Sequence, residues 1–305
     1  MYKKILIIAD IEGSTGCANY TASSFNTELW YDACIDMSMD INSIVKKLFE
    51  SGVEKIYVKD FHRTGYNLLP ELIDKRARII HGYKKGPVLG IGSVYDAEAA
   101  MFIGMHASSG SEGFLAHTFT SRYSSIMLNS RRVSELQLFA SSLYKYSIKP
   151  IFFSGCPIAC NEAMEDIKGI SVFPIIKDKF GKIEDALCIS QLAEAAADSL
   201  VNDFVKPYII DPPFNAEIKM RDAEKAAKNI SDRWKIRQKD ATVLFTAKNF
   251  DEFYEKLIDI TYLMPSLKKI TPLALLLFNL YGRLGLAIVR FMRRSKIKAQ
   301  SLLQK

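Results

Sequence analysis

An apolar segment near the N-terminus, followed at once by two acidic residues, places the strongest constraint on the fold. Residues 5–9 (ILIIA) are continuously apolar, which is typical of a parallel strand that is covered on both faces. Asp10 and Glu12 follow in a loop that contains Gly13 and Gly16. Ligands of open α/β sheets bind at the carboxyl ends of the strands, so this loop is a candidate functional site. Two carboxylates this close need a cation or a raised pKa to coexist, unless the loop is an exposed acidic one.

Strand and helix patterns alternate along most of the chain. Residues 26–50 carry apolar side chains at helical spacing, and a hairpin is predicted at residues 124–133. Ser134 is expected to cap a helix that starts at Glu135. Further strands are predicted at residues 53–60, 77–82, 99–104, 150–154 and 170–177. This alternation predicts an α/β fold with a three-layer α/β/α core and a mostly parallel sheet.

The chain is expected to divide into three parts. Residues 1–207 contain the alternating strands and helices that build the α/β domain. Residues 208–265 are expected to form a smaller α+β portion, which opens with a strand at residues 208–220. Pro212-Pro213 in that strand suits an edge or a bend better than a central position. Residues 266–305 form a basic amphipathic C-terminal tail.

The net charge of +7 is concentrated in this tail, which has nine Lys or Arg residues and no Asp or Glu. Residues 1–265 contain 32 basic and 34 acidic side chains and so carry a net charge of −2. A basic groove for nucleic acid is therefore not expected. Five cysteines without a C-x-x-C pair indicate reduced thiols, and no secretory signal is expected ahead of the first strand. These features predict a cytoplasmic location.

Residues 270–292 of the tail are apolar apart from a narrow polar stripe. On a helix, Asn279, Arg283, Arg290 and Arg294 fall within about 60° of one another. Three interpretations stay open: peripheral contact with an anionic membrane through residues 270–294, packing within an oligomer, or a membrane span. A span would place Arg283 near the middle of the bilayer, at a cost of at least ~2.5 kcal/mol.

Three of the four histidines are predicted to lie near the carboxyl ends of strands. His62 and His106 directly follow two of the predicted strands, and His117 lies in the loop beyond His106. A single histidine is more often a hydrogen-bonded structural residue, but these strand ends converge with the acidic pair on one crevice. Imidazole and carboxylate together suit Zn²⁺, and neighbouring carboxylates can bridge two metal ions roughly 3.5–4 Å apart. No G-x-S-x-G, G-x-G-x-x-G or Walker A string favours a serine hydrolase or a nucleotide site.

Five short motifs resemble those of a known enzyme family. They are ADIEGSTG (9–16), KDFHRTGYN (59–67), FIGMHA (102–107), FLAHTF (114–119) and RRVSELQL (131–138). In order and spacing they resemble the motifs of the zinc-dependent D-aminopeptidases of the dipeptide-transport-operon type, the DppA family. The resemblance extends over residues 1–265 and leaves the tail outside it.

The resemblance implies a set of site residues. In the family, two zinc ions are held by an Asp and a Glu after the first strand, two histidines from later loops and a Glu at the start of a helix. The matching residues here are Asp10, Glu12, His62, His106 and Glu135. The family's catalytic histidine matches His117, which would either attack the scissile carbonyl or deprotonate or orient a water molecule.

The resemblance also implies an activity and an assembly. Family members release N-terminal D-amino acids such as D-alanine from short peptides, and they assemble as a decamer that encloses the active sites. We therefore expect a zinc-dependent aminopeptidase that acts on short D-amino-acid-containing peptides as a homo-oligomer. Two alternatives stay open: a metallohydrolase of another small amide, or a catalytically idle, membrane-associated peptide-binding protein on the same scaffold.

Overall fold

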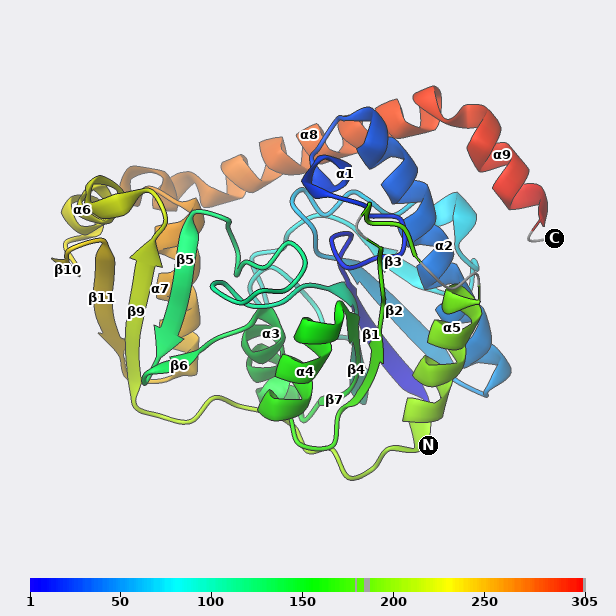
Figure 1. Cartoon of the computed structure of the whole chain (residues 1–305), viewed down its shortest axis with the longest axis horizontal. Helices are drawn as coiled ribbons and strands as arrows, with labels where there is room; N and C mark the ends of the chain where they lie inside the picture. The colour runs from blue at the N-terminus through cyan, green and yellow to red at the C-terminus, as the bar shows by residue number, and fades with distance from the viewer. Residues whose placement is uncertain (179, 184–186, 304–305) are drawn as a thin grey trace.

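A six-stranded parallel sheet forms the centre of the larger part of the molecule (Figure 1). The computed structural model describes residues 1–178, 180–183 and 187–303. The strands run in the order β3-β2-β1-β4-β7-β8, and every neighbouring pair is parallel. They are β1 (Lys4–Ala9), β2 (Lys55–Asp60), β3 (Arg78–Ile80), β4 (Ala99–Met105), β7 (Lys149–Gly155) and β8 (Ser171–Pro174).

Helices cover both faces of this sheet. Helices α2 (Glu28–Glu50) and α5 (Cys188–Asp198) pack against each other on one side, and α3 (Glu135–Leu143) and α4 (Pro157–Asp166) lie on the other (Figure 1). The apolar residues Ile5–Ala9 of the central strand β1 are fully buried as a result. The predicted three-layer α/β/α core is confirmed.

A second sheet, which is antiparallel, lies beside the parallel sheet and the helices that cover it. Its strands, in order, are β10 (Arg237–Lys239), β11 (Thr242–Ala247), β9 (Phe214–Met220), β5 (Tyr123–Leu128) and β6 (Arg131–Arg132). Helices α6 (Ala223–Trp234) and α7 (Phe250–Tyr262) pack on it. The predicted hairpin is confirmed as β5–β6, and β5 pairs with β9. The second sheet therefore takes strands from both sides of residue 207, and a domain division at that residue stays a prediction.

One expected element is shorter than the sequence pattern indicates. The strand expected at residues 208–220 begins only at Phe214, because Pro212 and Pro213 have no backbone N–H to pair with a neighbouring strand. The short elements are α1 (Tyr20–Ser23), η1 (Pro70–Leu72), η2 (Tyr144–Tyr146), η3 (Ser199–Val201) and η4 (Pro265–Ile270).

The C-terminal tail forms two helices on the outside of the molecule. Helix α8 (Thr271–Met292) runs along one edge, from the side of the second sheet toward α2, and α9 (Arg294–Leu303) follows it (Figure 1). Residues Lys268–Met292 are long and apolar enough to cross a membrane, by length and composition alone. Two exposed arginines of the polar stripe of α8 bond to the body of the protein: Arg290 pairs with Glu71, and Arg283 donates to Tyr66 Oη.

The start of α3 is fixed by Ser134, as the sequence predicts, and the structure shows that this cap is a capping box with Gln137. Ser134 Oγ accepts from Gln137 N at 3.3 Å, and Gln137 Oε1 accepts from Ser134 N at 3.0 Å. Ser134→Ala should therefore lower the free energy of unfolding by about 0.5–2 kcal/mol. Denaturant unfolding measures this loss, and Ser134→Thr, which keeps the hydroxyl, is the matched control. An unchanged unfolding free energy in Ser134→Ala would show that the cap does not stabilise the helix.

Candidate metal centre

The candidate site lies where the strand order of the parallel sheet reverses. The chain builds β2 and β3 on one side of β1 and then crosses to place β4 on its other side. Asp10 and Glu12 follow β1, His106 follows β4, and His62 follows β2. The crevice outside such a reversal point is the usual ligand site of open α/β sheets.

Close contact between two loops brings the acidic pair to His106. Gly13 N donates to Gly104 O at 2.7 Å. A Cβ atom at Gly13 would lie 2.0 Å from Met105 O, so only glycine allows this approach. The loop after β1 therefore packs directly on the end of β4.

The remaining two residues come from outside the parallel strands. Glu135 is the first residue of α3, and its Oε1 accepts from Phe119 N at 2.7 Å. His117 lies in the loop that follows His106, and the two imidazole rings stack with centroids 3.9 Å apart. All six predicted site residues thus meet in one place.

The carboxylates and imidazoles form three overlapping groups with metal-ligand spacing. Asp10, Glu12 and His62 make the first group, and Asp10, His106 and Glu135 make the second; within each, one ligand atom per residue lies within 4.8 Å of the others. Glu12, His106 and His117 make the third group, and Asp10 belongs to the first two. Two ions that share Asp10 would each have three protein ligands, which leaves a position for substrate or water at each ion.

The distances within these groups suit a small cation. His106 Nε2 lies 3.5 Å from Asp10 Oδ2 and 3.5 Å from Glu135 Oε1. His62 Nε2 lies 3.9 Å from Glu12 Oε1. Ligand atoms of a tetrahedral zinc ion are roughly 3.3–3.6 Å apart, because each lies about 2.0–2.2 Å from the metal. The site therefore needs only small adjustments to hold Zn²⁺.

His117 differs from the other five in its exposure. Its side chain is 17% exposed, whereas those of the five predicted ligands are 1–9% exposed. Its Nδ1 lies 2.8 Å from Leu115 O, so the neutral ring donates there and leaves the Nε2 lone pair available. Nε2 in turn lies 3.4 Å from Glu12 Oε2. His117 is thus placed at the open rim of the site, within reach of a bound molecule.

Burial and crowding shift the pKa values of the cluster. Burial, together with the neighbouring Glu12, raises the pKa of Asp10 to about 7. Burial would lower the pKa of His106, but Glu135, Glu12 and Asp10 hold it well above its usual range. Burial acts against ionisation of Glu135 as well, yet His106 lowers the pKa of that carboxyl to about 2. The charges of this site balance only through protons or a cation, as is typical of functional clusters.

The sequence does not predict the residues that hold the site residues in place, because nothing in the spacing of these supporting residues distinguishes them. Asn67 Oδ1 lies 3.4 Å from His62 Nδ1, and Asn67 Nδ2 donates to His62 O at 2.8 Å. Asp60 in turn accepts from both Asn67 N and Asn67 Nδ2. Asn67 stands inside the motif at residues 59–67, so the available signal was its place beside His62. Such a contact orients the ring so that Nε2 faces the metal position.

Two further residues hold the acidic loop after β1. Thr15 donates from its backbone N and its hydroxyl to the buried carboxylate of Asp40 on α2. Lys177, beyond the end of β8, donates to Cys17 O at 2.7 Å and Glu12 O at 3.4 Å. Thr15 lies inside the motif at residues 9–16, but no motif marks Asp40 or Lys177 in the sequence.

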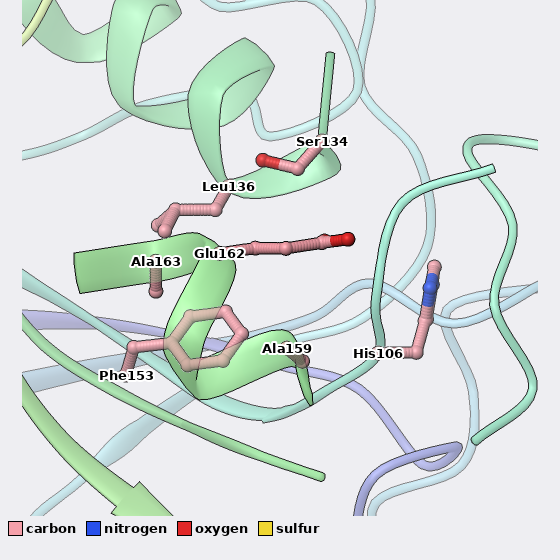
Figure 2. Close-up of a pocket in the computed structure, with 7 residues that line it drawn as sticks. All are labelled: His106, Ser134, Leu136, Phe153, Ala159, Glu162 and Ala163. Atoms are coloured by element: carbon pink, nitrogen blue, oxygen red, sulfur yellow. The ribbon is translucent and has the colours of Figure 1, made fainter. Parts of the chain in front are cut away.

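A narrow cavity lies behind His106, and Figure 2 shows its lining. Glu162 extends from α4 toward the loop that follows His106, where it accepts from Ser108 N at 2.8 Å and Ser108 Oγ at 3.0 Å. The cavity is too tight to admit a water molecule. Its lining residues are His106, Ser134, Leu136, Phe153, Ala159, Glu162 and Ala163. This region therefore supports the His106 loop and does not hold a substrate.

Known proteins are similar to this chain in sequence and in structure. The D-aminopeptidase of Bacillus subtilis (strain 168) is 26% identical over 272 residues, which cover 85% of this chain and 97% of the relative. A solved structure, described as the zinc-dependent D-aminopeptidase DppA from Bacillus subtilis, a self-compartmentalizing protease, superposes with a TM-score of 0.77. Its identity is 25%, and the match covers 85% of this chain and 97% of that chain.

A family model described as D-aminopeptidase, Peptidase_M55, matches residues 3–258. This match ends before η4 and leaves α8 and α9 outside it. The fold and the predicted enzyme class agree with these relatives. The chain belongs to the D-aminopeptidase family, Peptidase_M55, and is a metallo-aminopeptidase.

Proposed function

We propose that the protein is a zinc-dependent aminopeptidase that hydrolyses short peptides with an N-terminal D-amino acid, such as D-alanine, at a two-metal site. The observation that carries this proposal is the pair of three-residue groups that share Asp10, with His117 at their open rim. Asp10, Glu12 and His62 would hold one zinc ion, and Asp10, His106 and Glu135 the other. When bound, zinc supplies Lewis acidity that polarises the scissile carbonyl and acidifies water.

His117 is proposed as the catalytic residue. Its Nε2 would take a proton from the water molecule that attacks the scissile carbonyl, or would itself attack the carbonyl. The contact between Nε2 and Glu12 Oε2, at 3.4 Å, directs this nitrogen toward the carboxylates of the candidate metal centre. The Leu115 carbonyl would keep the ring in the orientation that this step needs.

The assembly and location are inferred from the relatives. The similar solved structure is described as self-compartmentalizing, so we propose a homo-oligomer, a decamer as in the DppA family, whose interior admits short peptides. A location in the cytoplasm fits a chain whose relatives act on peptides. The two alternatives, another small amide as substrate or an idle peptide-binding protein, predict different results in the activity test below.

The zinc-loaded protein should release D-alanine from D-Ala-D-Ala and D-Ala-Gly-Gly faster than L-alanine from the L-peptides. His117→Ala should lower kcat by at least about 100-fold while bound zinc is unchanged, because the residue acts on the substrate rather than on the metal. Chromatographic detection of free alanine measures this, with Glu112→Ala in the same loop as control. Zinc binding without turnover of any peptide would favour the idle binding protein, and turnover of a non-peptide amide alone would favour the other hydrolase.

The shared position of Asp10 predicts unequal effects on zinc content. Asp10→Asn keeps the shape of the side chain but removes its negative charge from both groups, so the protein should lose most of both ions. His62→Ala and Glu135→Ala should each lower the content from two ions to about one. Elemental analysis after dialysis measures the zinc per chain. A single ion in the wild type, unaffected by His62→Ala, would contradict the two-metal arrangement.

The outer face of α8 supports a proposal of peripheral membrane contact. Six of its exposed apolar side chains lie within about 100° of one another around the helix. They are Leu273, Leu276, Leu277, Leu280, Leu284 and Phe291. Phe278, Tyr281 and Met292 are exposed outside this arc. Arg283 is exposed as well, and its Nε donates to Tyr66 Oη of the body. A helix lying in the plane of a membrane would bury its apolar face without moving Arg283 from its partner.

Basic side chains near the outer face favour an anionic lipid surface. Arg294 and Lys298 line a groove at the junction of α8 and α9 together with Phe291 and Leu302. The nearby carboxylates pair with other cations, since Glu71 binds Arg290, and Asp32 binds Arg293 and Lys296. Anionic headgroups would therefore meet cations beside apolar side chains, which is the composition of interfacial helices.

Vesicle co-sedimentation tests this membrane contact. The wild type should bind phosphatidylglycerol vesicles, more weakly at high salt, and only weakly bind phosphatidylcholine vesicles. Leu276→Asp with Leu284→Asp should abolish binding, whereas Phe204→Asp, an exposed apolar position on the body, should not. If the wild type ignores vesicles and the double variant forms smaller oligomers, another copy of the chain covers this face and the membrane proposal is wrong.

A further inference from the structure

We propose that the inner face of α8 packs against the loop that carries His62 and holds it in position, so that the tail stabilises one of the two metal positions. We call this set of contacts the strut. This inference rests on the proposed two-zinc site. The tail lies outside the part of the chain that matches the family, which ends at residue 258. Three separate contacts connect α8 to His62.

Two glycines let α8 approach the body closely. A Cβ atom at Gly282 would lie 2.4 Å from Tyr66 Cδ2, and one at Gly285 would lie 2.3 Å from Phe25 Cε2. Both glycines are buried and face the same side of the helix, three residues apart. Because glycine costs about 1 kcal/mol relative to alanine inside a helix, its use twice at this face indicates that the close contact matters.

The first contact reaches His62 through its own loop. Gly282 lies against Tyr66 and Thr64, and Arg283 Nε donates to Tyr66 Oη at 3.3 Å. In the same loop, Gly65 N donates to His62 O at 2.7 Å. Displacement of Tyr66 would therefore move the turn that begins at His62.

The second contact passes through two aromatic rings. Gly285 and Tyr281 press on Phe25, whose ring lies 4.8 Å from that of Trp30. Trp30 is fully buried and donates from Nε1 to Asn67 Oδ1 at 3.0 Å. Asn67 contacts His62 at both its ring and its carbonyl, as described above. The helix thus supports the residue that orients the His62 imidazole.

The third contact fixes the neighbouring loop after β3. A Cβ atom at Gly82 would lie 2.0 Å from Asn279 Oδ1, and Asn279 Nδ2 donates to Tyr83 O at 3.5 Å. Gly82 N donates to Gly65 O at 2.8 Å, within the His62 loop. All three contacts therefore converge on the same short segment of the body.

The strut acts on one metal position more than on the other. His62 belongs to the group of Asp10 and Glu12, whereas His106 and Glu135 form the second group with Asp10. His106 and Glu135 are placed by β4 and α3, and the hydrogen bonds traced from α8 lead to the His62 loop. The link from α8 to α3 passes instead through three successive ring contacts, from Phe278 to Tyr83, Phe61 and Phe139. Loosening α8 should consequently weaken one zinc ion and spare the other, a result that general destabilisation would not give.

The test compares two leucine substitutions on opposite faces of α8. Gly282→Leu should push the helix away from Tyr66, whereas Ala287→Leu adds the same side chain to the exposed face. Zinc titration against a competing chelator should show the weaker of two ions lost, or bound about 10–100-fold less tightly, in Gly282→Leu only. Circular dichroism and thermal unfolding show whether each variant is folded.

If Gly282→Leu does not fold, Arg283→Met, which removes the guanidinium and its hydrogen bond to Tyr66, provides the same test with a smaller expected loss. The strut would be overturned if the folded variant and the control bound each of the two ions with the same affinity. An equal loss of both ions would overturn it as well. If the wild type itself binds no zinc, the failure belongs to the proposed function and not to the strut.

Discussion

Three carboxylates buried at one crevice are the constraint on which the rest of the structure depends. Asp10, Glu12 and Glu135 are each at most 7% exposed, and two imidazoles lie among them. Such a group is costly to bury unless cations or protons balance it. The reversal of strand order, the glycine contact at Gly13 and the capped start of α3 all bring these charges into one crevice.

The fold and the predicted site could be inferred from sequence because their signals are local. The apolar run before Asp10 specifies a doubly covered strand, and a polar residue at the end of such a strand necessarily points into the crevice. Glu135 is different, since its own spacing says only that it lies in the first turn of a helix. Its place in the site was implied by the family motif and not by any local pattern.

Other features depend on contacts between distant segments, which no local pattern encodes. The polar stripe of Asn279, Arg283 and Arg290 is visible in the sequence, but its partners are not. The body supplies Tyr83, Tyr66 and Glu71 as hydrogen-bond partners. The close contacts at Gly282 and Gly285, which connect α8 to the His62 loop, are likewise visible only in the fold.

Anomalous diffraction at the zinc absorption edge, from crystals of the full chain grown with zinc, tests the central claim most directly. The account predicts two peaks roughly 3.5–4 Å apart, one between Glu12 and His62 and one between His106 and Glu135, with Asp10 contacting both. A single peak that either His62 or Glu135 does not contact, or zinc bound only at other residues, would contradict it.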